Sequence, residues 1–370
     1  MTSAQVEIQL IAVVVSVGCA LPGVFLVLRR LAMASDAITH SVLLGIVVAF
    51  FVVRDLSSPA LVAGAALTGL VTVWLIELLR RTGLVREDAA IGLVFPALFS
   101  IGVILVSRYA GSVHLDIDVV LLGDVAFAPF DRFVLFGWDW GPAALVKMTA
   151  ILLLNAVLIG AFWKELKVAS FDPGLAYALG FSPALVHYGL MGLVSVTAVG
   201  AFDAVGSILV VALMVGPPVT AYLLTDRLGT MVGLAAAMGA TGGIAGYWLA
   251  YWLDASIAGS IAAVIGLQFA AALFLAPGRG LVALWRRRAR QRVRFAETML
   301  AIHLLTHEGR PEAAVESRLD HLRELLRWDE PFADRIVRSA VRGRLVTAGA
   351  GGLELTDRGR ELAAEAIAES

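Results

Sequence analysis

Long apolar runs separated by short polar segments dominate the first three quarters of the chain. A run of about 20 apolar residues is long enough to cross a bilayer as an α-helix. We therefore predict a series of membrane-spanning helices. The runs predict nine of them, at residues 6–28, 37–53, 59–79, 89–107, 141–163, 184–201, 205–225, 228–252 and 257–276.

The segment 117–137 interrupts this regular pattern. It is apolar but contains Asp118, Asp124, Pro129 and Asp131. Polar and helix-breaking residues at membrane depth are tolerated where a segment does not face lipid, so a re-entrant or interfacial helix fits better than a crossing. If the segment crosses, another span must be lost, and we therefore expect eight or nine crossings in total.

Positive charges alternate between the two sets of loops. Cytoplasmic loops of membrane proteins carry an excess of arginine and lysine, so the richer set predicts the cytoplasmic side, with the N-terminus outside and the C-terminus inside. The poorer set consists of Arg54, Arg108 and Arg132. The richer set consists of Arg29, Arg30, Arg80, Arg81, Arg86, Lys164, Lys167, Arg227 and Arg279.

Composition supports a multi-pass helical membrane protein, which we expect in the cell (inner, cytoplasmic) membrane. The 370 residues are 59% hydrophobic and 16% charged, and their mean hydropathy is +0.85. The single cysteine, Cys19, excludes a disulfide framework and a thiolate zinc site. No basic segment precedes the first apolar run, which is also too long for a signal peptide, so we expect no cleaved leader.

The character of the chain changes after Pro277. Residues 281–294 form a basic juxtamembrane linker, and residues 295–370 have the periodicity of amphipathic helices, so we predict a membrane domain at 1–280 followed by a cytosolic domain. This order of elements is typical of a small winged helix-turn-helix domain. The expected elements are helices at 295–308, 313–327 and 331–343, strands at 344–348 and 352–356, and a last helix from Thr356.

Asp36 and His40 are the strongest candidates for chemistry. Residues four apart share one face of a helix, so the carboxylate and the imidazole can reach one ion. Oxygen and nitrogen ligands suit manganese, iron and zinc alike. The alternative is that Asp36 caps the second helix and His40 is a polar group at its end.

Two catalytic motifs are absent. A phosphate-binding loop needs a Gly-Lys pair, but the only lysines, Lys147, Lys164 and Lys167, follow Val, Trp and Leu. The His-Glu-x-x-His motif of zinc proteases is also missing. We therefore expect a protein that is not an enzyme and cannot hydrolyse ATP by that mechanism.

Four motifs, in order along residues 1–276, resemble the membrane subunits of ABC importers for manganese, zinc or iron. The first is Arg-Arg-Leu-Ala-Met-Ala-Ser-Asp-Ala-Ile-Thr-His-Ser-Val-Leu-Leu-Gly at Arg29–Gly45. The others lie at Glu87–Phe95, Phe171–Gly180 and Val205–Ala221. Ser35, Thr39 and Leu44 depart from the family pattern, which has Gly, Ser and Pro there.

The resemblance implies an all-α permease whose Asp36 and His40 contact the transported divalent metal, with no permanently bound cofactor. It also implies a homodimer or a dimer with a paralogous permease, separate cytosolic ATPase subunits and an extracytoplasmic metal-binding protein. The coupling segment that contacts the ATPase would contain Phe171, Asp172, Pro173, Ala176 and Gly180. Without the resemblance, the same segment is an ordinary loop in which Asp172 caps a turn.

The C-terminal domain resembles the DNA-binding domain of iron-dependent metalloregulators. Its would-be recognition helix carries Arg335, Arg338 and Arg342, but neighbouring acids such as Asp334 balance them. We therefore favour a structural or regulatory module over a nucleic-acid binder. His303 and His307, again four apart, form either a solvated helix face or a cytosolic metal sensor.

The leading hypothesis is the permease subunit of an ATP-driven importer of a divalent transition metal. Two alternatives remain open at this point: a membrane-tethered metal sensor with a DNA-binding winged helix, and an ATP-independent metal carrier. Glu77 and Asn155 fall within predicted spans, where each either pairs with neighbouring groups or lies in the ion path.

Overall fold

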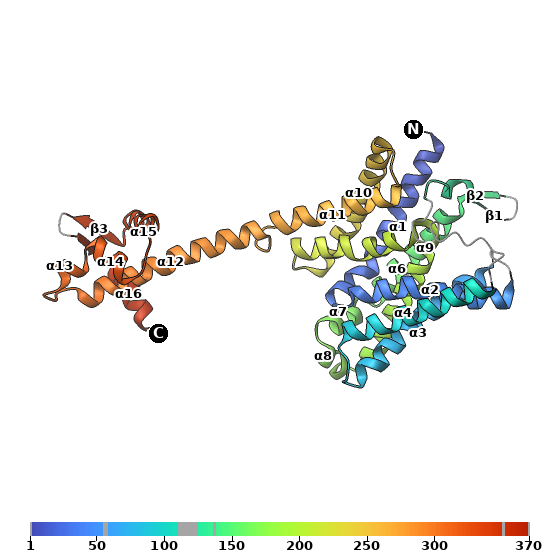
Figure 1. Cartoon of the computed structure of the whole chain (residues 1–370), viewed down its shortest axis with the longest axis horizontal. Coiled ribbons are helices and arrows are strands. Elements are labelled where there is room, and N and C mark those ends of the chain that lie inside the picture. The colour runs from blue at the N-terminus through green and yellow to red at the C-terminus, as the bar shows by residue number, and fades with distance from the viewer. Residues whose placement is uncertain (1, 55–57, 110–124, 136–137, 350–351, 369–370) are drawn as a thin grey trace. The chain divides into compact units, whose positions relative to one another are not determined.

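Two compact units make up the chain, Met1–Gly280 and Leu281–Ser370. The computed structural model describes residues 2–54, 58–109, 125–135, 138–349 and 352–368 (Figure 1). In the described part of the first unit, eight helices are long and apolar enough to cross a membrane. They are α1 (Ser3–Leu28), α2 (Ala32–Val53), α3 (Pro59–Arg81), α4 (Glu87–Tyr109), α6 (Ala143–Ala161), α9 (Pro183–Leu224), α10 (Leu228–Leu253) and α11 (Ile257–Leu275).

The predicted spans 184–201 and 205–225 are joined in one element, the 42-residue helix α9. The join is interrupted at Gly206, whose φ of 76° and ψ of 164° are not helical. Residues with a Cβ atom rarely adopt this positive φ, whereas glycine does so at little cost. The two predicted spans are therefore two helical segments that meet at a kink at Gly206, and the predicted turn at 202–204 lies within the first segment.

Helices α1 and α9 form the centre of the first unit. Helix α1 packs against α6, α9 and α10, and α9 also packs against α2, α3 and α11 (Figure 1). Large side chains such as Phe25, Leu209 and Met214 are fully buried between them. The more peripheral helices α4, α6 and α11 bury a much smaller share of their apolar residues. Apolar surface left exposed on long helices is the normal state of a protein that faces lipid.

Helix α2 begins at Ala32, five residues before the predicted start. It runs without a break through Leu44, and its packing on α3 is close because Gly45 and Gly64 lie face to face. A Cβ atom on Gly45 would come within 2.4 Å of the backbone oxygen of Gly64. Small residues at such a crossing are typical of membrane helices.

A small hairpin replaces the predicted re-entrant helix in the described part of 117–137. The 3-10 turn η1 (Ala128–Phe130) leads into β1 (Arg132–Leu135), which pairs with β2 (Trp138–Pro142) in antiparallel fashion. Arg132 binds both Asp139 of β2 and Glu7 of α1, so the hairpin is anchored to the bundle. Pro129 and Asp131 explain the error, since neither favours a helix interior. The remainder, including Asp118 and Asp124, lies outside the described residues.

The second unit begins with α12 (Leu281–His307), which includes the whole predicted basic linker. Its core contains Leu300, Leu322 and Ile336. The predicted helix 313–327 is split into two, because the backbone oxygen of Ser317 accepts a hydrogen bond from Leu353 instead of continuing a helix. The remaining elements are α13 (Ala313–Glu316), α14 (Leu319–Leu325), α15 (Glu330–Arg342), β3 (Val346–Gly349), β4 (Gly352–Leu355) and α16 (Asp357–Ala368), with β3 and β4 antiparallel.

Candidate functional site

Asp36 and His40 lie on successive turns of α2 and face each other. His40 Nε2 is 3.3 Å from Asp36 Oδ1, and the two side chains are 28% and 32% exposed, respectively. Asp36 does not cap the helix, because the residue before the first turn is Leu31 and no side chain caps there. The capping alternative is therefore excluded by the position of the helix start.

Aromatic rings of α4 line one side of this pair. The imidazole centroid of His40 is 5.7 Å from the ring of Phe95 and 6.2 Å from that of Phe99. On a neighbouring face of α2, Thr72 of α3 donates a buried 2.7 Å hydrogen bond to Ser41. These contacts, together with the Gly45–Gly64 crossing, determine how α2 is rotated and therefore where the pair points.

Within the part of the chain that the structure describes, the pair has no further protein ligands beside it. Among the described residues, no third histidine, cysteine or carboxylate lies close enough to complete a metal-binding group with Asp36 and His40. Two protein ligands leave most coordination positions of a divalent ion to water or to groups from another subunit.

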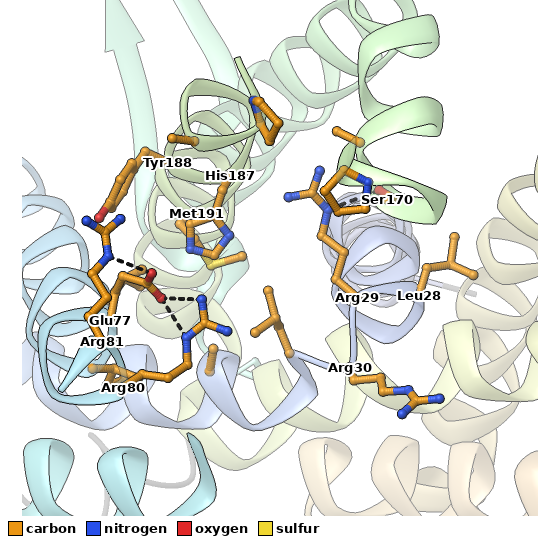
Figure 2. Close-up of a pocket in the computed structure, with 18 of the residues that line it drawn as sticks. Leu28, Arg29, Arg30, Glu77, Arg80, Arg81, Ser170, His187, Tyr188 and Met191 are labelled. Atoms are coloured by element: carbon orange, nitrogen blue, oxygen red, sulfur yellow. Dashed lines mark hydrogen bonds and ion pairs between the residues drawn. The ribbon is translucent and has the colours of Figure 1, made fainter. Parts of the chain in front are cut away.

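A separate pocket of about 520 Å³ lies at the end of α1 and α3. Figure 2 shows Glu77 beside Arg80 and Arg81 on one wall, and Arg29 beside Ser170 on another. Glu77 Oε2 is 2.7 Å from an Arg80 nitrogen, and its Oε1 is 3.0 Å from Arg81 Nε. Asp36 and His40 do not line this pocket.

Arg29 connects the start of the first motif to the helix before the predicted coupling segment. Its Nε donates a 3.0 Å hydrogen bond to Ser170 Oγ at the end of α7 (Trp163–Phe171). Burial lowers the pKa of the Arg29 guanidinium from its usual value. Sequence reasoning missed this contact, because Arg29 and Ser170 are far apart in the chain and a lone serine carries no signal.

The predicted coupling segment forms the short helix α8 (Pro173–Ala178). Asp172 caps it, because Oδ1 accepts a 2.9 Å hydrogen bond from the backbone nitrogen of Leu175. Ala176 is fully buried, while Gly180 ends the segment with a φ of 86°. Four large apolar side chains of the segment are exposed, namely Phe171, Leu175, Tyr177 and Leu179.

Glu77 and Asn155, which the sequence placed within predicted spans, both pair with their neighbours. Glu77 binds Arg80 and Arg81 at the edge of the pocket described above. Asn155 is fully buried and donates hydrogen bonds to the backbone oxygen of Gly18 (2.9 Å) and to Thr197 Oγ1 (3.0 Å). Asn155 therefore joins α6 to α1 and α9.

In the second unit, the arginines of α15 are exposed. Arg335, Arg338 and Arg342 all lie at the surface, and Arg338 Nε and Arg342 Nε donate to backbone oxygens one turn earlier in their own helix. Asp334 and Glu330 are exposed on the same helix. The mixed charge of this helix agrees with the balance seen in the sequence.

Comparison with known proteins gives a consistent result. The model of the ABC 3 transport family matches residues 3–276. The chain is 49% identical over 357 residues to the zinc transport system membrane protein TroD of Treponema pallidum, covering 96% of this chain and 97% of that one. It is also 49% identical over 270 residues to the manganese transport system membrane protein MntD of Bacillus subtilis, covering 73% and 91%.

A solved structure shares this fold. PsaBC from Streptococcus pneumoniae, determined in complex with Fab, superposes with a TM-score of 0.64 at 27% identity. The match covers 77% of this chain and 96% of that chain. The similarity to MntD covers a share of this chain close to that of the first unit, whereas the similarity to TroD extends over nearly the whole chain.

Proposed function

The chain belongs to the ABC 3 transport family, and on that premise we propose that it is the membrane permease of an ATP-driven importer of divalent transition-metal ions. The observation that carries the proposal is the Asp36–His40 pair, a carboxylate and an imidazole 3.3 Å apart on an apolar helix. Such groups are expensive to place in a membrane and are retained where they serve a pathway.

Asp36 and His40 would bind the transported ion as it passes. One oxygen and one nitrogen ligand suit manganese, zinc and iron, and the rings of Phe95 and Phe99 shield one side of the imidazole from water. In a homodimer, or a dimer with a paralogous permease, the second subunit would bring its own α2 to the pathway at the pseudo-two-fold axis. A site of few protein ligands holds an ion weakly enough to release it.

Helix α8 would contact a separate ATPase subunit and couple its conformational change to the permease. The capped first turn of α8 and the buried Ala176 hold the helix against the permease, while Leu175, Tyr177 and Leu179 project outward. An exposed apolar group of this kind marks a surface that another protein covers. On this proposal the segment is more than a capped turn, and Phe171, Asp172, Pro173, Ala176 and Gly180 would form the docking element.

The binding protein, and the side of the membrane on which α8 and the C-terminal unit lie, follow from the same proposal. An extracytoplasmic binding protein would deliver the ion to the outer face. The excess of positive charge in one set of loops supports a cytoplasmic position for α8 and for the C-terminal unit. The order of helices and hairpin in that unit supports a winged-helix domain, and the mixed charge of α15 favours a structural or regulatory role over DNA binding.

Metal accumulation tests this function directly. Cells that lack the gene are complemented with it, and uptake of Mn²⁺, Zn²⁺ and Fe²⁺ is measured in parallel, with and without ATP depletion. We expect restored uptake of at least one ion, and loss of that uptake when ATP is depleted. Uptake that persists without ATP would support the ATP-independent carrier, and no uptake of any of the three ions would refute the proposal.

A further inference from the structure

Three imidazoles and one carboxylate meet in the C-terminal unit. His303 and His307 lie on α12, Glu316 ends α13, and His321 lies on α14. One ligand atom from each of His303, His307 and Glu316 lies within 4.8 Å of the others, the only such group of three among the described residues. The sequence-based hypothesis named His303 and His307 but not Glu316 and His321. The chain reverses direction between α12 and α13, so helical spacing could not predict that these residues meet.

Glu316 lies at the centre of the cluster. Its Oε2 is 3.2 Å from His303 Nε2 and 2.9 Å from His321 Nε2. In a tetrahedral site with metal–ligand bonds of about 2.0–2.1 Å, neighbouring ligand atoms are about 3.3 Å apart. These two separations are close to the spacing that the ligands of one ion require, and the ligand atoms of His303, His307 and Glu316 lie within 4.8 Å of one another.

Burial and hydrogen bonding separate this cluster from a solvated helix face. The side chains of His303, Glu316 and His321 are only 10%, 19% and 35% exposed. Within the described residues, His321 Nε2 is buried and forms no hydrogen bond, although it lies 2.9 Å from Glu316 Oε2. A buried polar atom that lacks a well-formed hydrogen bond is costly, and a bound ion would satisfy it.

His307 is oriented by its own helix. Its Nδ1 lies 3.0 Å from the backbone oxygen of His303. Since a carbonyl oxygen only accepts, Nδ1 carries the proton and Nε2 keeps its lone pair. A hydrogen bond of this kind from the second ring nitrogen is what orients most metal-binding histidines.

The cluster is both supported and accessible. Leu304 directly follows His303, and Leu322 directly follows His321. Both leucines are buried in the core of the unit. His307 and Glu316 also line a pocket of about 350 Å³ at the surface of this unit. The ligands are thus held by packing, and an ion can reach them from solvent.

From this geometry we propose that His303, His307, Glu316 and His321 form a binding site for one divalent transition-metal ion. Three nitrogen ligands and one oxygen ligand favour Zn²⁺ and Co²⁺ over Mn²⁺. Four protein ligands leave no open position, so the site is structural or regulatory and joins α12 to α13 and α14. The site does not depend on the transport function proposed above, because none of its ligands belongs to the membrane unit.

The test uses the full-length chain in detergent with Asp36→Ala and His40→Ala already present, which removes the candidate transport pair. Binding of Zn²⁺, Co²⁺ and Mn²⁺ is measured by calorimetry, and the visible absorption of bound Co²⁺ reports its coordination. We expect one Zn²⁺ per chain, a tetrahedral Co²⁺ spectrum and the weakest binding for Mn²⁺.

Single substitutions then identify the ligands. His303→Ala, His321→Gln or Glu316→Ala should each weaken Zn²⁺ binding by more than about tenfold. Loss of a residue that only orients a metal ligand already costs about tenfold or more in affinity, so loss of a ligand should cost at least as much. Glu324→Ala, an exposed carboxylate on the same helix as His321, is the matched control and should bind normally. Thermal unfolding without metal shows which variants remain folded.

Two results would overturn the proposal. One is a parent chain that binds no Zn²⁺, or binds Mn²⁺ more tightly than Zn²⁺. The other is unchanged Zn²⁺ binding in the folded His321→Gln and Glu316→Ala variants. Neither result affects metal accumulation by cells, which tests the transport function separately.

Discussion

Arg29 Nε donates a 3.0 Å hydrogen bond to Ser170 Oγ, which ties the connection between α1 and α2 to the end of α7. Asp36 lies one and a half turns or so beyond this connection, and the predicted coupling segment begins directly after Ser170. The contact is therefore a short physical link between the helix that carries the candidate metal ligands and the surface proposed to meet the ATPase.

Loss of the Ser170 hydroxyl should loosen this link. In Ser170→Ala, the half-buried guanidinium of Arg29 loses a hydrogen bond, which costs roughly 1 kcal/mol at such a site. We expect a lower ratio of transported metal to hydrolysed ATP in reconstituted vesicles. Ser170→Thr keeps a hydroxyl and should behave nearly as the parent; equal ratios in the alanine and threonine variants would show that the bond has no role in coupling.

Removing either member of the metal pair should abolish transport. Asp36→Ala and His40→Ala each delete one of the two protein ligands that face each other on α2, and we expect metal accumulation to fall more than about tenfold. The variants should still reach the membrane and assemble with the ATPase, as judged by co-purification. Asp254→Asn is the matched control, because Asp254 is exposed at the end of α10 in a left-handed conformation that asparagine tolerates. Normal uptake by either alanine variant would remove the pair from the pathway.

A charge on the outer face of α8 should prevent docking of the ATPase. Leu175→Glu and Tyr177→Glu place carboxylates on a surface that is apolar and exposed, and desolvating them in an interface is costly. We expect the ATPase to be lost on purification, while the permease itself unfolds at an unchanged temperature. Leu84→Glu changes an exposed leucine in the loop between α3 and α4 and should leave the complex intact. Retention of the ATPase by both α8 variants would place its docking surface elsewhere.

The carboxylate of Asp172 should matter as a cap and not as a charge. Asp172→Ala removes the acceptor for the backbone nitrogen of Leu175, and loss of such a cap costs about 1 kcal/mol. We expect α8 to fray and ATPase activity to respond less to metal. Asp172→Asn retains a capping oxygen and should restore the response. If the asparagine variant is as impaired as alanine, a charge interaction with a partner is the better explanation.

Asn155 should stabilise the bundle. Asn155→Ala leaves the backbone oxygen of Gly18 without its donor in a buried site and removes the link to Thr197, for which we expect a loss of about 1 kcal/mol and a lower unfolding temperature in detergent. Thr241→Ala, which removes an exposed hydroxyl contact with Gln268, should have a smaller effect. Reduced transport at unchanged stability would instead assign Asn155 to the ion path.

Much of the membrane unit follows from local properties of the sequence. Apolar length predicts a crossing wherever a run exceeds the thickness of the bilayer, and each of the eight described spans coincides with such a run. Motif resemblance correctly identified the family. The Asp36–His40 contact also followed from spacing alone, since helix geometry places residues four apart on one face.

Errors arose where a neighbour in space, or a single backbone conformation, decided the outcome. The break between two predicted spans lies at Gly206 and not at 202–204, because the kink needs a positive φ that glycine adopts readily. Ser317 ended a predicted helix because its carbonyl bonds to Leu353 of β4. The local pattern of apolar residues contains neither piece of information.

By itself, then, the sequence determined the position of most membrane helices, the two candidate ligands on one face of a helix, and the resemblance to metal permeases. Only the tertiary structure placed Ser170 against Arg29, and Glu316 and His321 against His303. The physical reason is the range of the interactions: hydropathy and helical periodicity act over neighbouring residues, whereas these contacts arise when distant segments pack together and bring their polar atoms within bonding distance.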